Sequence, residues 1–154
     1  MPEVKILNLS PNPDPAYETT GSAGFDLAVS RRVVLGPQTS ALLPTGLRMV
    51  IPEGFEGQIR LRSSMYKRGI VMPNAPGTID SDYRGEIFIA VRNMYQNNDV
   101  LFNAGDRIAQ MVINEVPKTV ITSVSPDEFA AYEATDRGAG GFGSTGSGMK
   151  SEGL

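Results

Sequence analysis

The segment Gln58-Ile59-Arg60-Leu61-Arg62 alternates polar and apolar side chains. A period of two places every second side chain on the same face, which is typical of a strand with one buried face. Similar short segments follow along the chain, separated by Gly, Pro, Asn and Asp residues that mark turns. We expect strands over residues 4–9, 25–29, 32–35, 46–51, 58–62, 86–92, 107–115 and 119–124. Many short strands of this kind predict an all-β fold, as a sandwich, a barrel or a jelly roll.

The composition fits one globular domain and excludes several kinds of chemistry. The chain has 154 residues, of which 40% are hydrophobic and 20% charged, and its 17 glycines and 11 prolines indicate many turns and few long helices. It contains no cysteine and no histidine, so a disulfide, a thiolate nucleophile and an imidazole base are excluded. An enzyme of this composition would use Asp or Glu as its base and would bind a hard, oxygen-liganded metal such as Mg²⁺.

The net charge and the hydropathy pattern bear on what the protein binds. The formal net charge is −3, so we expect no general attraction to nucleic acid or to an anionic membrane surface. No apolar run reaches the roughly 18 residues that a membrane-spanning helix needs. The first residues also lack the pattern of an export signal. We therefore expect a cytoplasmic protein whose partners include neither a membrane nor a nucleic acid.

The composition changes near residue 135. Before that point, Ser125 and Pro126 are typical of a helix N-terminus and predict a helix over residues 126–132. After it, six glycines fall within residues 138–148, so this part cannot build a core. Arg137 and Phe142 stand among these glycines and could bind a phosphate and stack on a base, although a plain Gly/Ser tail is the alternative. We expect a β domain over residues 1–134 and a flexible Gly-rich C-terminal arm over residues 135–154.

Four further segments contain charged or hydroxyl side chains that bear on function. Residues 77–86, with the sequence GTIDSDYRGE, place Asp80 and Asp82 two residues apart and on one face if the segment is extended. Such a pair could bind a metal or supply a general base, and the same residues also suit a hairpin turn. Residues 23–27, 62–64 and 105–110 have the sequences AGFDL, RSS and GDRIAQ. The RSS segment suits a phosphate and equally a solvated strand end, the GDRIAQ segment fits a plain hairpin, and the single acid of AGFDL alone decides nothing.

Together with residues 137–146, RGAGGFGSTG, these segments resemble the five motifs of the trimeric dUTPase (deoxyuridine 5′-triphosphate nucleotidohydrolase) family. The resemblance spans residues 4–146 and is most specific in 77–86 and 137–146. It implies a distorted jelly-roll (β-clip-like) domain that forms a homotrimer, with active sites shared between subunits and the arm closing over a neighbouring subunit's site. It also implies a dUTP diphosphatase, which hydrolyses dUTP to dUMP and pyrophosphate with Mg²⁺ as its cofactor.

The resemblance assigns recognition of the nucleoside, and the chemistry, to residues 74–83. Asp80 matches the family's water-activating base for attack on the α-phosphorus. Tyr83 matches the tyrosine that packs against deoxyribose and leaves no room for a 2′-hydroxyl. Asn74 matches the asparagine that contacts uracil, and three further positions are implied beside it: Gly77, Thr78 and Ile79.

The phosphates and the metal are assigned to other motifs. The phosphate contacts match Arg62, Ser63, Ser64 and Gln110. Asp26 matches the acid of the first motif, for which two roles stay open, since it could hold Mg²⁺ through water or act structurally. The metal would otherwise be held mainly by the substrate phosphates.

The remaining implied contacts lie on the following strand and in the arm. Phe88 stands at a spacing where the family makes a nucleotide contact. Arg137 would reach the γ-phosphate and Phe142 would cover uracil, and three neighbours complete the implied arm contacts: Gly143, Ser144 and Thr145. Asp82 and Arg107 are expected to support the turn and the subunit contacts.

Two other functions stay open. A dCTP deaminase, or a bifunctional relative, shares the fold, but that family needs a glutamate at the position matched by Ala90. A non-catalytic trimeric binding module is the second alternative. Such a module has no need to combine a base, a tyrosine against the sugar and an arginine in the arm, so the hydrolase is favoured.

Overall fold

The computed structural model describes residues 1–144 and 146. The chain divides after Lys118 into two compact units, Met1–Lys118 and Thr119–Leu154. The first unit contains eleven strands and one 3₁₀ helix, η1 (Ser63–Arg68). The strands are β1 (Lys5–Asn8), β2 (Phe25–Ala28), β3 (Val33–Leu35), β4 (Ser40–Pro44), β5 (Leu47–Val50), β6 (Phe55–Leu61), β7 (Ile70–Val71), β8 (Gly77–Ile79), β9 (Phe88–Asn93), β10 (Val100–Phe102) and β11 (Arg107–Glu115).

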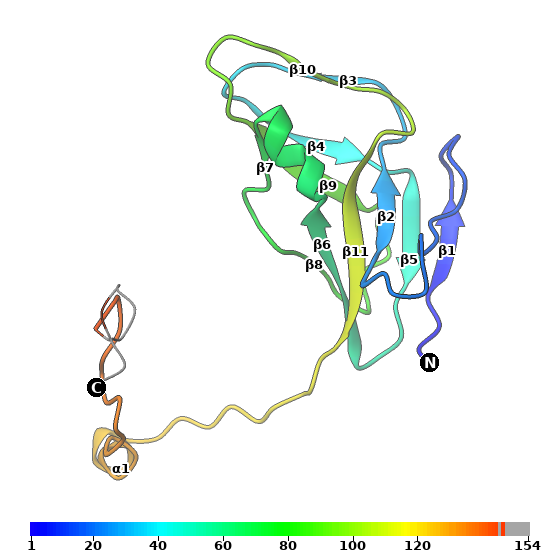
Figure 1. Cartoon of the computed structure of the whole chain (residues 1–154). Helices are drawn as coiled ribbons and strands as arrows, with labels where there is room; N and C mark the ends of the chain where they lie inside the picture. Colours follow the sequence, from blue (N-terminus) through cyan, green and yellow to red (C-terminus); the bar gives the residue numbers. More distant parts are fainter. Residues whose placement is uncertain (145, 147–154) are drawn as a thin grey trace, which may run out of the picture. The chain divides into compact units, whose positions relative to one another are not determined.

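The strands form four antiparallel sheets, in the orders β2-β11-β6-β8, β4-β9-β7, β1-β5 and β10-β3. The strand β11 lies between β2 and β6, so residues near both ends of the unit meet in one sheet (Figure 1). The inward side chains of the two larger sheets belong to one buried core, which includes Leu27, Ile59, Ile89, Val91 and Met111. Sequence-distant strands paired in several short sheets around one core define an all-β, distorted jelly roll. The expected fold class is thereby confirmed.

Most of the expected strands are present, with ends shifted by a few residues. The strand predicted over 107–115 has those bounds, and the strand predicted over 58–62 begins three residues earlier, at Phe55. Four short strands were not predicted: β4, β7, β8 and β10. The strand β4 ends in a proline, which argues against a strand on local grounds, yet all five of its residues pair with β9.

The strand predicted over residues 119–124 was wrong. Within the described part of the chain this segment has no strand assignment, and Val120 and Ile121 are 91% and 93% exposed. A strand is stable only when a neighbouring strand pairs with its backbone groups. The segment therefore has the residues of a strand without a partner.

In its described residues, the second unit contains one short helix, α1 (Pro126–Ala130). The helix starts as predicted, because the Ser125 side chain accepts a hydrogen bond from the Glu128 backbone N–H and the Glu128 carboxylate accepts one from the Ser125 N–H. The Ser125 N–H, by donating to that carboxylate, lowers the pKa of Glu128 below its ordinary value. No helix in the described residues is long and apolar enough to cross a bilayer.

The glycine of the AGFDL segment is required by close packing between β2 and β11. A Cβ atom at Gly24 would lie 2.6 Å from the carbonyl oxygen of Met111 and 3.1 Å from Oε1 of Gln110. The first contact is with backbone, which cannot move without breaking the pairing of β11. Gly24 therefore lets the chain enter β2 directly beside Gln110.

We expect Gly24→Ala to lower the free energy of unfolding by about 1–3 kcal/mol, because the added methyl group must push β2 away from β11. Urea unfolding followed by circular dichroism measures this change. Gly21→Ala is the matched control, since nothing lies within 4 Å of a Cβ at residue 21. Equal stabilities for the two variants would contradict this account of Gly24.

Candidate active site

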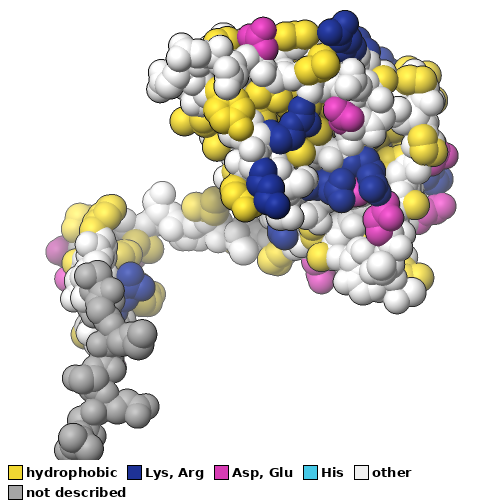
Figure 2. Space-filling model, turned by 45° about the horizontal axis from the view of Figure 1, so that its top comes forward, with side chains coloured by type: hydrophobic (Ala, Val, Ile, Leu, Met, Phe, Trp, Pro, Cys, Tyr) yellow, Lys and Arg dark blue, Asp and Glu magenta, His cyan; other side chains and the backbone are white. Residues whose placement is uncertain are grey.

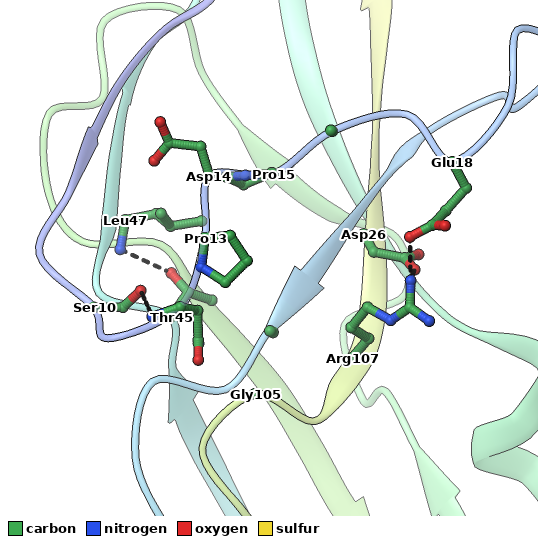
Figure 3. Close-up of a pocket in the computed structure, with 13 residues that line it drawn as sticks. Ser10, Pro13, Asp14, Pro15, Glu18, Asp26, Thr45, Leu47, Gly105 and Arg107 are labelled. Carbon is green, nitrogen blue, oxygen red and sulfur yellow. Dashed lines mark hydrogen bonds and ion pairs between the residues drawn. The ribbon is translucent and has the colours of Figure 1, made fainter.

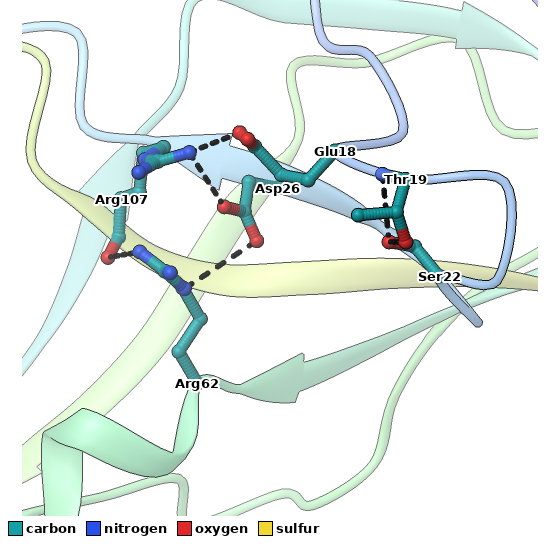
Figure 4. Close-up of polar contacts among 6 residues, drawn as sticks. All are labelled: Glu18, Thr19, Ser22, Asp26, Arg62 and Arg107. Carbon is teal, nitrogen blue, oxygen red and sulfur yellow. Dashed lines mark hydrogen bonds and ion pairs between the residues drawn. The ribbon is translucent and has the colours of Figure 1, made fainter.

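Three charged side chains from three separate segments meet at one end of the largest sheet. The Asp26 carboxylate on β2 lies 3.4 Å from Arg62 Nε and 3.2 Å from Arg107 Nη1 (Figure 4). Arg62 Nη1 also donates to the Arg107 carbonyl oxygen at 3.3 Å, and the Arg62 backbone N–H donates to the Ile108 carbonyl oxygen at 2.9 Å. The structure thus brings together residues from the 23–27, 62–64 and 105–110 segments, which lie up to 81 positions apart in the chain.

The Asp26 carboxylate is the least exposed member of this cluster. Its side chain is only 15% exposed, and its Oδ2 atom is buried without a hydrogen-bond partner in the described part of the chain. Arg107 Nη1 is near Oδ2, but it donates its hydrogen bond to Glu18 instead (Figure 4). A buried carboxylate oxygen that lacks a donor is costly, so this atom is available to a ligand or to water.

Strand register places the polar side chains of this region on one face. Gln110 on β11 lies opposite Asp26 on β2 and opposite Arg60 on β6, so the three side chains form a row across the sheet. Arg62 follows two residues after Arg60 and falls on the same face, as the alternation of residues 58–62 predicts. Ser63 and Ser64 follow it as exposed residues at the start of η1. The predicted phosphate-binding residues are therefore neighbours.

A cavity of about 310 Å³ opens beside this cluster. Asp26, Arg107 and Glu18 form one side of it, and the 10–16 segment forms another (Figure 3).

Figure 2 shows Lys and Arg side chains grouped on the face of the larger unit in view, with Asp and Glu side chains among them. The charges on that face are therefore of both signs and not a continuous basic surface.

The residues predicted to bind uracil lie around β8, the edge strand of the same sheet. Gly77 is buried against Ile59 of β6, and the Asn74 amide is near it, since a Cβ at residue 77 would lie 3.6 Å from Asn74 Nδ2. One side of an edge strand has backbone N–H and C=O groups that no neighbouring strand occupies. Thr78 and Ile79 belong to this edge, so their backbone groups are suited to read the edge of a base.

The segment that follows β8 is a turn and not an extended strand. The Tyr83 N–H donates to the Asp80 carbonyl oxygen at 3.1 Å, and Arg84 Nη1 donates to the Ser81 and Tyr83 carbonyl oxygens. The condition under which Asp80 and Asp82 would share one face of a strand is therefore not met. Asp80 is exposed at the rim of a hollow of about 710 Å³ that Asp82 and Arg84 also line.

The Tyr83 ring is fixed against the backbone of this turn. Its hydroxyl donates to the Glu86 carbonyl oxygen at 3.0 Å. A Cβ at Gly85 would lie 2.3 Å from the Tyr83 hydroxyl oxygen and 2.6 Å from Cζ. The ring can take this position only because residue 85 has no side chain.

Within one chain, Asp80 lies far from the cluster of Asp26, Arg62 and Arg107. In the antiparallel pairing of β6 with β8, Ile79 lies opposite Gly57, so Asp80 follows beside the start of β6. Arg62 follows the other end of β6, six residues beyond Glu56, which corresponds to about 20 Å along a strand. The hollow at Asp80 and the cavity at Arg107 have no lining residue in common.

Phe88 belongs to a different sheet from this cluster, and the arm belongs to the second unit. Phe88 is on β9, in the β4-β9-β7 sheet, where it lies opposite Pro44. In the second unit, Arg137 Nε donates to the Gly140 carbonyl oxygen at 2.9 Å, and the Phe142 ring is fully exposed. Gly143 has a φ of 88° and Ser144 closes a turn with Gly141. Thr145 lies outside the described residues.

Two polar residues near the cluster were not predicted. Arg60 could have been found, because the alternation of residues 58–62 puts it on the face of Arg62. Glu18 has no local signal, since its partner Arg107 is 89 residues away in the sequence.

Among residues 1–144 and 146, no group of three acidic residues is arranged to hold a metal ion.

Fold and site together define a jelly-roll protein with a cluster of two arginines around a buried carboxylate. Comparison with known proteins assigns the family, because the dUTPase family model matches residues 10–146. The deoxyuridine 5′-triphosphate nucleotidohydrolase of Rhizobium etli is 50% identical over 137 residues, which cover 86% of this chain and 84% of that protein. That of Wolbachia pipientis is 48% identical over 150 residues, which cover 94% and 95%. This chain belongs to the dUTPase family and is a hydrolase.

Solved structures show the same fold. A variant of the Staphylococcus bacteriophage 80alpha dUTPase with dUpNHpp is 26% identical and superposes with a TM-score of 0.80, covering 94% of this chain and 99% of that one. A variant of the dUTPase from phage phi11 of S. aureus, whose structure reveals the coordination of a structural Mg(II) ion, superposes with a TM-score of 0.75 at 25% identity. That comparison covers 82% of this chain and 99% of the phage chain.

Proposed function

We propose that the protein hydrolyses dUTP to dUMP and pyrophosphate. The observation that carries the proposal is the meeting of three of the family's motifs at the Asp26 carboxylate. The 62–64 and 105–110 segments meet at Asp26, while the 77–86 segment forms an edge strand and a turn. A dCTP deaminase is not favoured, because the residue at the position of the required glutamate is Ala90, on β9.

The cluster around Asp26 is the proposed phosphate site. The planar guanidinium of Arg62 suits a phosphate oxygen pair, and the Ser63 and Ser64 hydroxyls stand next to it at the start of η1. Gln110 lies in the same row and contributes an amide donor. The arrangement concentrates neutral and charged donors where a polyphosphate carries its negative charge.

The turn and edge strand after residue 74 are the proposed nucleoside site. Uracil presents an O4 acceptor and an N3–H donor, whereas cytosine presents the reverse at these two positions. The Asn74 amide and the free backbone groups of Thr78 and Ile79 can pair with the first pattern, and a site of this kind can reject a mispaired base by about 10⁴-fold. The fixed ring of Tyr83 would exclude a 2′-hydroxyl by contact, and Phe88 would make a further nucleotide contact.

Asp80 is the proposed base. Its carboxylate is exposed at the rim of a hollow and can accept a proton from a water molecule. The oxygen of that water attacks the α-phosphorus, the bond from the α-phosphorus to the bridging oxygen breaks, and pyrophosphate leaves with that oxygen. Because a carboxylate is a modest base, alignment of the water and stabilisation of charge on the phosphates must supply much of the acceleration.

The residues present fit Mg²⁺ that is held mainly by the nucleotide. Mg²⁺ commonly binds through one or two carboxylates together with substrate phosphates and several waters. Asp26 provides one buried carboxylate oxygen without a hydrogen bond in the described residues, and it would hold the ion through water. When bound, the metal would neutralise charge on the phosphates and restrict their conformation.

We further propose a homotrimer in which each site is completed by neighbouring subunits. Two observations support this assembly. About 20 Å of β6 separates Asp80 from Arg62 within one chain. Val120 and Ile121 are exposed apolar side chains on a segment that pairs with no strand of the described residues. A neighbouring copy could supply the other residues of the site and could also bury the Val120 and Ile121 side chains. The arm over residues 135–154 would then close over a neighbour's nucleotide, with Arg137 at the γ-phosphate and Phe142 over uracil. Gly143, Ser144 and Thr145 would add contacts to it.

The wild-type protein should release pyrophosphate from dUTP in the presence of Mg²⁺, with far lower kcat/KM for dCTP, dTTP and UTP. We expect Asp80→Asn to keep the affinity for dUpNHpp within about threefold and to lower kcat by at least about a hundredfold, because the base is lost while the binding groups stay. A coupled pyrophosphate assay measures kcat, and calorimetry measures binding.

Asp99→Asn removes an exposed carboxylate from the loop after β9 and serves as the control for the change in charge. A near-wild-type kcat for Asp80→Asn would show that another group activates the water. Release of ammonia from dCTP, with no pyrophosphate from dUTP, would identify a deaminase instead.

Gly85→Ala tests whether the position of Tyr83 excludes ribonucleotides. The added methyl group overlaps the Tyr83 ring and must displace it, so we expect kcat/KM for UTP to rise by about tenfold relative to dUTP. Tyr83→Phe keeps the ring and should leave the ratio nearly unchanged. A ratio in Gly85→Ala equal to that of the wild type would contradict the role of the fixed ring.

A further inference from the structure

The proposal below rests on the phosphate site described above. We propose that Glu18 is a counter-ion of Arg107 that a substrate phosphate can displace. In the absence of nucleotide the Glu18 carboxylate pairs with the Arg107 guanidinium, and a bound phosphate competes with Glu18 for that guanidinium. Arg107 thereby becomes a phosphate-binding residue as well as a structural one. Glu18 lowers the affinity for polyphosphate and so favours the release of pyrophosphate.

The two acidic partners of Arg107 differ in how firmly they are held. The Asp26 side chain is 15% exposed, belongs to β2 and also contacts Arg62, whereas the Glu18 side chain is 60% exposed and lies in an irregular segment before β2 (Figure 4). Asp26 therefore stays within ion-pair distance of Arg107, at 3.2 Å, when Glu18 moves. Glu18 can move away without disturbing the sheet.

The pair between Glu18 and Arg107 is weak enough to exchange. Exposed ion pairs contribute little to stability, because water screens them and two side chains must be ordered. The Arg107 side chain is 46% exposed, so a phosphate can reach it from the cavity that Glu18 lines. The Thr19 N–H and hydroxyl contact the Ser22 hydroxyl at 3.1 and 3.0 Å, which closes a small turn next to Glu18.

The charge balance gives the direction of the effect. Arg62 and Arg107 are matched one to one by Asp26 and Glu18, so the cluster carries no net charge while Glu18 is in place. A triphosphate or pyrophosphate brings several negative charges and replaces the single charge of Glu18 as the partner of Arg107. Removing the Glu18 charge removes this competition and leaves one cation unmatched.

We expect Glu18→Gln to bind both dUpNHpp and pyrophosphate two- to fivefold more tightly than the wild type at low salt, which is the range that an exposed ion pair supplies. The difference should shrink at about 0.5 M NaCl, where charges are screened over a few ångströms. Pyrophosphate should also inhibit the variant more strongly. Calorimetry with each probe at two salt concentrations measures these changes.

Glu3→Gln is the matched control, because it makes the same change in net charge at an exposed residue that does not belong to the ion pairs of the cluster. It should bind both probes as the wild type does. Unchanged or weaker binding by Glu18→Gln would overturn the proposal, as would an equal gain in Glu3→Gln. If the wild type binds pyrophosphate but not dUpNHpp, the proposed function fails, while the pyrophosphate comparison of the two variants still decides the role of Glu18.

Discussion

The antiparallel pairing of β6 with β11 on one side and with β8 on the other is the constraint on which the site depends. The pairing with β11 brings Arg62 to Asp26 and Arg107, and the pairing with β8 directs the Asp80 turn to the opposite end of the strand. Both consequences follow from the register of β6 with its two neighbours. A strand extends by about 3.3 Å per residue, so residues at its two ends lie far apart. The groups proposed to bind phosphate and the group proposed to activate water thus lie at opposite ends of β6, the strand that positions them both.

This separation gives a physical reason for the proposed sharing of sites between subunits. If Asp80 is the base and the Asp26 cluster binds the phosphates, a chain in which the two face different hollows would gain a complete site only from a second copy. The exposed apolar residues Val120 and Ile121 indicate the same need, since such side chains favour cover by another surface. Gly24 and Gly85 each allow one close contact. Gly24 lets β2 pass close to Gln110, and Gly85 leaves room for the Tyr83 ring.

Much of the fold could be predicted from local patterns, and the geometry of the site could not. Alternation in residues 58–62 and the Ser125 cap predicted β6 and the start of α1, because both signals lie within a few residues of one another. The strand expected over 119–124 was wrong, since a strand also needs a partner that local sequence does not specify. The resemblance to a family named the residues of the phosphate cluster, but the contacts of Glu18 and Arg107 depend on register between distant strands. Their placement required the structure.

Complementation between two inactive variants tests the division of the site most directly. Arg62→Gln and Asp80→Asn chains, each inactive alone, are unfolded in urea, mixed in equal amounts and refolded together. If every site takes Asp80 from one chain and Arg62 from another, about one site in four receives both intact residues, and about a quarter of the wild-type dUTP hydrolysis should return. Activity in the mixture no greater than the sum of the two variants refolded separately would show that one chain supplies both residues, and would contradict the account.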